Sequence, residues 1–112
     1  MSVKTTTESD TESIDHPLTN LTGFRRDLLY VVAELDAPSG LEIKAELEAD
    51  YGQPVGHGRL YPNLDRLVED GYLRKGSKND RTNEYTLSEK GLKAIEQHHR
   101  WVSDRVPEVD AL

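Results

Sequence analysis

Residues 56–87 constrain the fold of this 112-residue chain more than any other stretch. After a Gly-His-Gly entry, apolar side chains recur at steps of three and four, which places them on one face of a helix: Leu60, Tyr61, Leu64, Leu67 and Val68. Gly71 ends this helix, because glycine readily adopts the left-handed backbone common at helix C-termini. The pattern predicts a short amphipathic helix with a sharp end.

A β-hairpin is predicted directly after this helix. Residues 72–75 alternate like a strand, residues 76–83 form a polar loop without apolar side chains, and residues 84–87 return with Tyr85 and Leu87 on one face. A helix followed at once by a hairpin with a basic tip is typical of the second half of a winged helix-turn-helix. The sequence therefore predicts a protein that binds DNA.

The overall net charge of −7 argues against a nucleic-acid binder, but the distribution of charge does not. Residues 36–50 carry five acidic side chains and one lysine, a net charge of −4. Residues 53–83 carry six basic and four acidic side chains, a net charge of +2, where helix and hairpin would meet phosphates. The acidic side chains in the rest of the chain are expected for a protein of a salt-rich cytoplasm. An ordinary soluble acidic protein is the alternative interpretation.

Composition excludes several other classes of protein. With 35% hydrophobic residues, the chain has room for one domain with a modest core. The absence of cysteine excludes disulfides, thiolate metal sites and thiol redox sensing. No run approaches the roughly 18 apolar residues of a membrane span, and no basic start precedes an apolar segment. We expect a cytoplasmic protein that has no membrane partner.

Four parts of the chain are predicted. Residues 1–18, rich in Ser, Thr and acidic side chains, form a flexible acidic tail, of which Ile14 and Leu18 can still pack on the domain or a partner. Residues 19–87 form the winged helix-turn-helix, residues 88–106 a C-terminal helix, and residues 107–112 a second tail. The fold class is mainly α with one small β-hairpin.

Two helices precede the stretch at residues 56–87. The first is capped by Thr19 or Thr22 and has an apolar stripe of Leu21, Phe24, Leu28, Val31, Val32 and Leu35. The second spans about residues 40–51, and Ser39 with Glu42 has the spacing of a capping box. Its predicted buried residues are Leu41, Ile43 in part, Leu47 and Tyr51.

The C-terminal helix, capped by Ser88, carries a narrow apolar seam with heptad-like spacing: Leu92, Ile95, His99, Val102 and Val106. A helix appended to a complete small domain needs a surface against which to bury such a seam. Packing against the first helix is one interpretation. We favour dimerisation through this helix, because a DNA reader with two-fold symmetry needs a second copy, and we expect a homodimer.

The motifs SGLEIKAELE, GRLYPNLDRLVEDGYL and EYTLSEKGLKAI closely resemble those of PadR-like winged-helix transcriptional regulators. The resemblance covers about residues 21–100, with Leu60-Tyr61-Pro62 as its most specific part; Ser88 replaces the usual threonine and keeps the capping hydroxyl. The single C-terminal helix is similar to the smaller branch of the family, and the acidic surface to its haloarchaeal members. The resemblance implies regulation of transcription.

Helix-turn-helix proteins point the N-terminal end of the recognition helix into the major groove. Pro62 is tolerated in a first turn, so the helix is predicted to begin near Gly58 or Arg59. Arg59 can then pair with guanine and Asn63 with adenine or a phosphate. The predicted DNA-binding residues are His57, Gly58, Arg59, Tyr61, Asn63, Arg66, Lys75, Lys78, Arg81 and Thr82.

Each of these residues also has a structural interpretation. Arg59 can be solvated or ion-paired, and an ion pair is favoured for Arg66 because three acidic residues lie nearby in the sequence. Tyr61 can bind phosphate or pack against the first helix. The hairpin lysines and arginines can belong to a charged loop that contacts nothing.

No enzyme is predicted. The chain lacks a cysteine nucleophile, a glycine-rich phosphate loop and a serine with suitably placed partners. His98 and His99 point in different directions on a helix, so no metal site is expected. No cofactor is expected either, although bound salt ions fit the acidic surface. The alternative function is a winged-helix module that binds another protein and no DNA.

Overall fold

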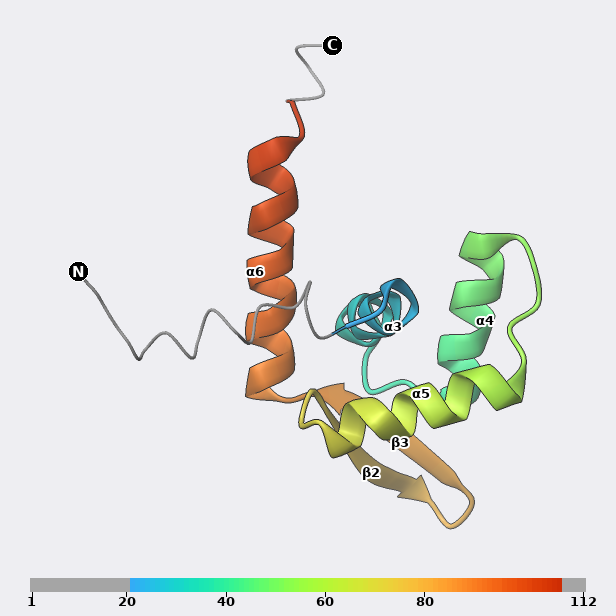
Figure 1. Ribbon diagram of the computed structural model, residues 1–112. Helices are drawn as coiled ribbons and strands as arrows, with labels where there is room; N and C mark the ends of the chain where they lie inside the picture. Colours follow the sequence, from blue (N-terminus) through green and yellow to red (C-terminus); the bar gives the residue numbers. More distant parts are fainter. Residues whose placement is uncertain (1–20, 108–112) are drawn as a thin grey trace.

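The computed structural model describes residues 21–107, which form four helices and one antiparallel hairpin. In chain order these are α3 (Gly23–Glu34), α4 (Gly40–Tyr51), α5 (His57–Glu69), β2 (Leu73–Asn79), β3 (Thr82–Leu87) and α6 (Glu89–Arg105). In Figure 1, α5 and the hairpin lie below α3 and α4, and α6 stands to one side. The predicted fold class is confirmed. The predictions for residues 1–18 and 108–112 lie outside the described residues.

Helix α3 lies at the centre of the domain, in contact with α4, α5, α6 and β3. The predicted stripe is buried or packed against the core, and Leu29, which lies outside that stripe, is fully buried beside Leu28. Neighbours on several sides widen the buried face of a helix beyond the stripe expected for a surface helix. Tyr30 is therefore also drawn into contact with α6.

Side-chain caps fix where the first two helices begin. Thr22 caps α3 by accepting a hydrogen bond from the Arg25 amide. Ser39 and Glu42 form the predicted capping box, with Ser39 Oγ 3.1 Å from the Glu42 amide and Glu42 Oε1 2.8 Å from the Ser39 amide. The predicted burial of Leu41 was wrong: its side chain is 60% exposed, because the inward face of α4 is made by Gly40, Ile43 and Leu47.

The hairpin is longer than predicted. Most of the polar stretch at residues 76–83 is strand, with a tight turn at residues 80–81 and an irregularity between Ser77 and Asn79. Both faces of this part are solvated, so backbone hydrogen bonds form the ladder without an alternating apolar pattern. Ser39 also pairs with Glu84 in an isolated bridge, and the Tyr85 amide donates to Pro38 O over 2.9 Å. The hairpin is thereby fixed to the α3–α4 turn.

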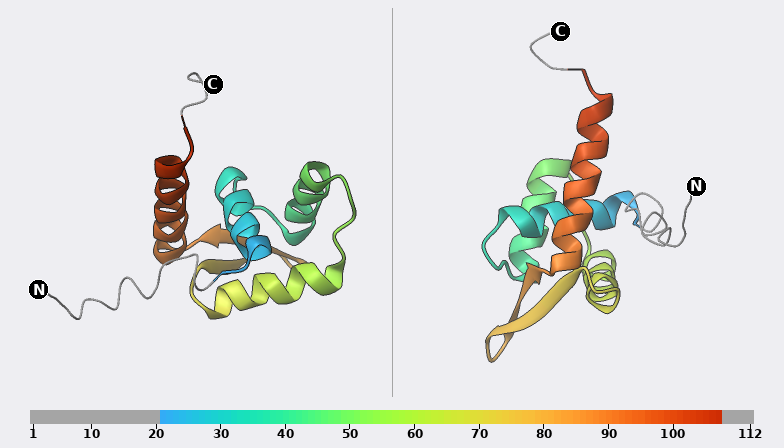
Figure 2. Two further views of the ribbon diagram at one scale, coloured as in Figure 1. Left: turned by 45° about the horizontal axis from the view of Figure 1, so that its top comes forward. Right: turned by 90° about the vertical axis from the view of Figure 1, so that its left-hand side faces the viewer.

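Helix α6 starts against the base of the hairpin. The Ser88 amide donates to Tyr72 O over 3.1 Å, and a Cβ atom on Gly91 would lie only 2.2 Å from the same oxygen. Higher up, the Tyr30 hydroxyl donates to Ile95 O over 3.2 Å and lies 2.8 Å from His98 Nδ1. The first half of α6 therefore packs on α3, while its second half extends away from the domain (Figure 2).

The contact at Gly91 gives a prediction for stability. Gly91→Ala should lower the free energy of unfolding by about 1–3 kcal/mol, because a backbone carbonyl cannot move aside as a side chain can. Gly58→Ala is the matched control, since no atom lies within 4 Å of its added Cβ; it should raise stability by roughly 0.5–1 kcal/mol. Urea unfolding measures both. Equal effects of the two substitutions would contradict the close packing at Tyr72.

Glu48 gives a prediction for pH dependence. Its carboxylate accepts from Lys44 Nζ and from the Val55 amide, each over 2.8 Å, and these bonds hold its pKa below the ordinary value of 4.5. A lowered carboxyl pKa means that the stabilisation is present above the ordinary pKa and is lost as the pH falls through the folded value. Glu48→Gln should therefore lower the Tm near neutral pH, and the difference from wild type should shrink below pH 4.5.

Thermal unfolding followed by circular dichroism at a series of pH values tests this. Glu34→Gln is the control, because its carboxylate makes no ion pair or hydrogen bond within residues 21–107. A Glu48→Gln difference that stays constant through the acid range would show that the charge of Glu48 plays no part.

Candidate nucleic-acid interface

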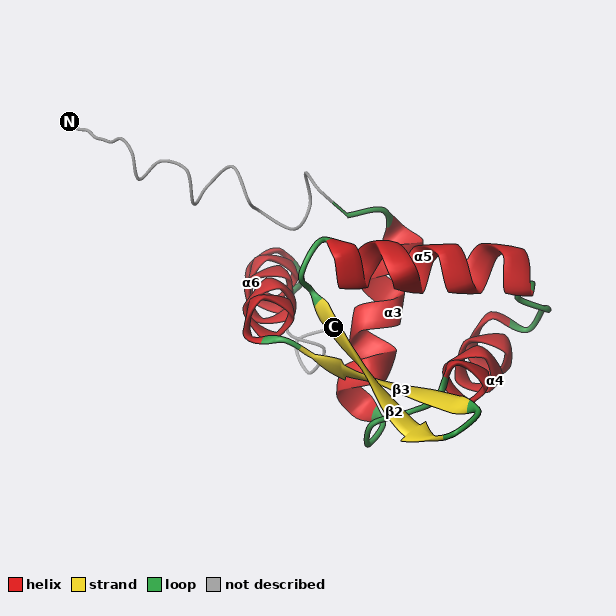
Figure 3. Cartoon of the chain, turned by 90° about the horizontal axis from the view of Figure 1, so that it is seen from below, coloured by secondary structure: helices red, strands yellow, loops and turns green. Residues whose placement is uncertain are grey.

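Helix α5 and the hairpin lie on the same side of the domain. Seen from below in Figure 3, α5 crosses in front of the first turns of α3, and β2 and β3 lie beside it. This side carries the predicted DNA-binding residues, which come from two elements separated in sequence by Gly71, whose φ is +85°. Helix α5 and the hairpin therefore lie side by side, in contact through β2.

Helix α5 begins at His57, with Gly56 as its N-cap. Pro62 is therefore its sixth residue, and the prediction of a proline in the first turn was wrong. The proline ring removes the backbone amide that would have donated to Gly58 O. Gly58 itself has no side chain, and the surface around it is open. The exposed residues of α5 are His57, Gly58, Arg59, Pro62, Asp65, Arg66 and Glu69.

Arg59 and Asn63 lie on the flank of α5 that meets α3. The Arg59 guanidinium stacks 4.0 Å from the centroid of the Phe24 ring. Asn63 Oδ1 accepts from Arg25 Nε over 2.8 Å, and Asn63 Nδ2 donates to Arg59 O over 2.7 Å. Both ends of the Asn63 amide are thus engaged within the protein, which favours a positioning role over the predicted contact with adenine or phosphate.

Tyr61 packs against α4 at Gly40 and against the core, whereas the sequence left phosphate binding and packing against the first helix as alternatives. A Cβ atom on Gly40 would lie 2.6 Å from the Tyr61 hydroxyl and from Cε1 of its ring, so only glycine permits this approach. The His57 ring meets Tyr61 edge-on, with 5.6 Å between centroids. Tyr61 also borders a surface hollow of about 300 Å³, whose lining includes Leu41, Arg81, Thr82 and Tyr85.

Ion pairs within the protein distinguish the predicted cationic residues from one another. Arg66 pairs with Asp70 over 3.2 Å, Lys75 with Asp65 over 3.6 Å, and Lys78 with Glu42 over 3.6 Å. Within residues 21–107, Arg59 and Arg81 have no carboxylate partner. Exposed ion pairs contribute only about 0–1 kcal/mol, so phosphates can still displace the paired carboxylates. The two unpaired arginines are the strongest candidates for DNA contact.

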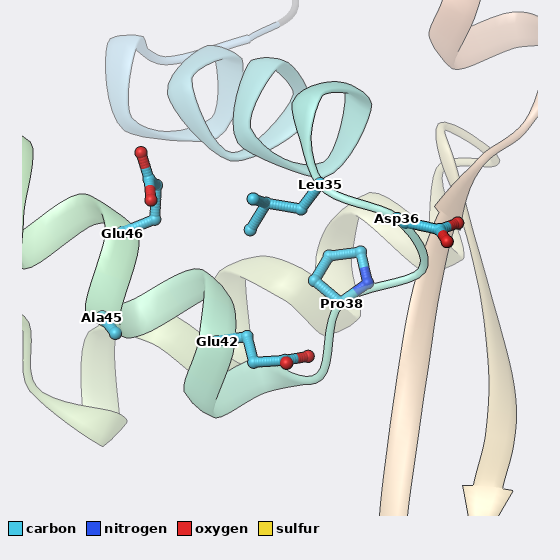
Figure 4. Close-up of a pocket in the computed structure, with 6 residues that line it drawn as sticks. All are labelled: Leu35, Asp36, Pro38, Glu42, Ala45 and Glu46. Carbon is cyan, nitrogen blue, oxygen red and sulfur yellow. The ribbon is translucent and has the colours of Figure 1, made fainter.

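A second hollow, of about 380 Å³, lies between the end of α3 and α4 and has an acidic lining (Figure 4). The side chains of Asp36, Glu42 and Glu46 point in different directions in this view and do not converge on one point. The Ser39 amide, followed by Lys78, holds the pKa of Glu42 below its ordinary value, so this carboxyl is ionised at neutral pH. This part of the surface repels phosphates.

The part of the chain that the structure describes contains neither a metal site nor a membrane span. No group of three His, Cys, Asp or Glu side chains within residues 21–107 is arranged to hold a metal ion. No helix in the same residues combines the length and apolar character that a bilayer-spanning segment requires.

Solved structures similar to this chain include winged-helix proteins of archaea and bacteria. RosR of H. salinarum, from crystals grown from NaBr, is 43% identical with a TM-score of 0.71, covering 81% of this chain and 83% of that one. The structure of a complex of hsRosR-S4 is 44% identical with a TM-score of 0.77, covering 84% and 82%. A mutant MarR of E. coli complexed with operator DNA is 27% identical with a TM-score of 0.61, covering 74% and 56%.

A comparison with curated proteins found no match. The model of the transcriptional regulator PadR-like family matches residues 28–97, which include α4, α5, the hairpin and most of α3. Together with the arrangement of α5 and the hairpin, this match shows that the chain belongs to the PadR-like family of transcriptional regulators.

Proposed function

We propose that this regulator binds a pseudo-palindromic promoter site as a homodimer, with α5 in the major groove and the hairpin on the adjacent backbone. The observation that carries this proposal is the presence of two exposed arginines, Arg59 of α5 and Arg81 of the hairpin turn, that have no carboxylate partner within residues 21–107. Cationic side chains on two outward elements are what a duplex requires. The similarity to MarR complexed with operator DNA adds support.

The homodimer is inferred from α6. Leu92 is 46% exposed and Val106 53%, and Trp101 also exposes a large apolar surface. Ile95 packs on the core of its own chain, so the seam predicted from the sequence is shared between α3 and the proposed partner. Two recognition helices in such a dimer would enter successive major grooves about 34 Å apart.

We also propose that the regulator acts in a stress response at high salt. The similarity to RosR of H. salinarum and the net charge of −7 support this setting. Glu69 stands on the exposed face of α5 without a cationic partner within residues 21–107, and its carboxylate would repel DNA unless cations lie between it and the phosphates. Bound salt ions are therefore proposed to mediate part of the contact.

A titration of DNA tests the proposed site. Promoter fragments selected by the purified protein should bind with an affinity that falls by about ten-fold or more in Arg59→Ala and in Arg81→Ala, because each variant loses a charged contact. Arg66→Ala is the matched control; it removes an arginine already paired with Asp70 and should weaken binding less. Fluorescence anisotropy measures all three.

The same titration separates the competing explanations. Absence of sequence-selective binding by the wild-type protein at every salt concentration would support the protein-interaction module instead. If cations are taken up on binding, the affinity will persist or rise as KCl increases. A steady fall with salt, as for a basic repressor, would contradict the proposed role of bound ions.

A test of the dimer uses the exposed apolar residues of α6. The wild-type protein should sediment at twice the 12.7 kDa of one chain, and Leu92→Glu with Val106→Glu should sediment as a monomer, because neither carboxylate can be buried at the seam. Gln97→Glu, which adds one negative charge at an exposed polar position of α6, should stay dimeric. A monomeric wild-type protein, or a dimeric double variant, would disprove this interface.

A further inference from the structure

Two arginines stand in the first turns of α3, where cations are unfavourable. Arg25 and Arg26 are the third and fourth residues of this helix, whose first turn contains no acidic side chain. The N-terminal end of a helix carries partial positive charge, so a guanidinium there is destabilising unless an anion is nearby. Within residues 21–107 neither arginine has a carboxylate partner, and the adjacent Asp27 accepts a hydrogen bond from the Tyr51 hydroxyl instead.

Arg25 is held in place from α5. Its Nε atom donates to Asn63 Oδ1 over 2.8 Å, across 38 positions of sequence, and Asn63 is itself fixed by its bond to Arg59 O. A guanidinium has five N–H groups. This contact occupies the Nε–H group of Arg25, and no hydrogen bond within residues 21–107 occupies its two terminal amino groups. The side chain is thus oriented while its terminal donors stay available.

Arg25 and the hairpin lie on opposite sides of α5. Helix α3 begins on the side of α5 that faces away from β2 and β3 (Figure 3). Arg59 stacks on Phe24 at the same flank, so Arg25 and Arg59 lie on one side of α5 and Arg81 lies on the hairpin at the other. A groove of duplex DNA is bordered by two phosphate strands, and unpaired arginines therefore stand on both sides of the helix that would enter it.

We propose that Arg25 binds a backbone phosphate of the strand that borders α5 on the side opposite the hairpin, and that Asn63 is the residue that positions it. This inference rests on the proposed function. Phosphate is the ligand because a guanidinium offers parallel donors that match its oxygens. Arg25 belongs to α3, at the flank of α5, so it meets the backbone and not the base edges.

Affinity measurements with chemically altered DNA test the contact. Arg25→Ala should weaken binding by about ten-fold, and by the same factor on selected and unrelated duplexes, because a phosphate contact carries no sequence information. Arg100→Ala, on the exposed surface of α6, is the control for net charge and should bind like wild type. Asn63→Ala should lose part of the affinity, since Arg25 remains but is no longer oriented.

Uncharged methylphosphonate groups placed singly along the site identify the phosphate itself. One substitution that weakens wild-type binding should have no further effect on Arg25→Ala, whereas the others should weaken both proteins equally. Urea unfolding of Arg25→Ala serves to show that the fold is retained. The inference is overturned if Arg25→Ala binds like Arg100→Ala, or if every methylphosphonate affects Arg25→Ala as it affects wild type. Failure of the wild-type protein to bind DNA would instead overturn the proposed function.

Discussion

Burial of α3 is the interaction on which the remaining structure depends. Leu28 and Leu29 are completely inaccessible, and a fully buried leucine contributes about 1.5–3 kcal/mol relative to an exposed one. The elements that contact α3 include α4, α5, β3 and α6, so the same apolar surface fixes α5, the hairpin and the proposed dimerisation helix relative to one another. A small domain with a modest core cannot position these elements through independent contacts.

Two close approaches then set the angles between elements. Tyr61 reaches α4 because Gly40 has no Cβ, and α6 reaches the base of the hairpin because Gly91 has none. Neither glycine has a positive φ, so the requirement at both positions is for space and not for backbone freedom. The contact at Gly91 sets the direction in which α6 leaves the domain. In the proposed dimer, that direction would set the spacing between the two copies of α5.

The distribution of charge explains how an acidic protein can bind an anionic ligand. Three cationic residues of the α5–hairpin side are paired with carboxylates of the same chain, whereas Arg59, Arg74 and Arg81 have no carboxylate partner within residues 21–107. The carboxylates of Asp36, Glu42 and Glu46 line a separate hollow between the end of α3 and α4. Local arrangement therefore determines what the surface can bind, while the net charge describes only the average over the chain.

Sequence alone determined the features that arise from neighbours in the chain. Capping at Ser39 and Ser88, the end of α5 near Gly71 and the apolar stripe of α3 follow from interactions within a few residues, and they were predicted correctly. The tertiary structure decided what depends on distant residues: the exposure of Leu41, the bridge from Ser39 to Glu84, and the engagement of Asn63 by Arg25. Periodicity shows which face of a helix is apolar, but only packing shows which polar side chains on the other faces already have a partner, and this distinction separates Arg66 from Arg59.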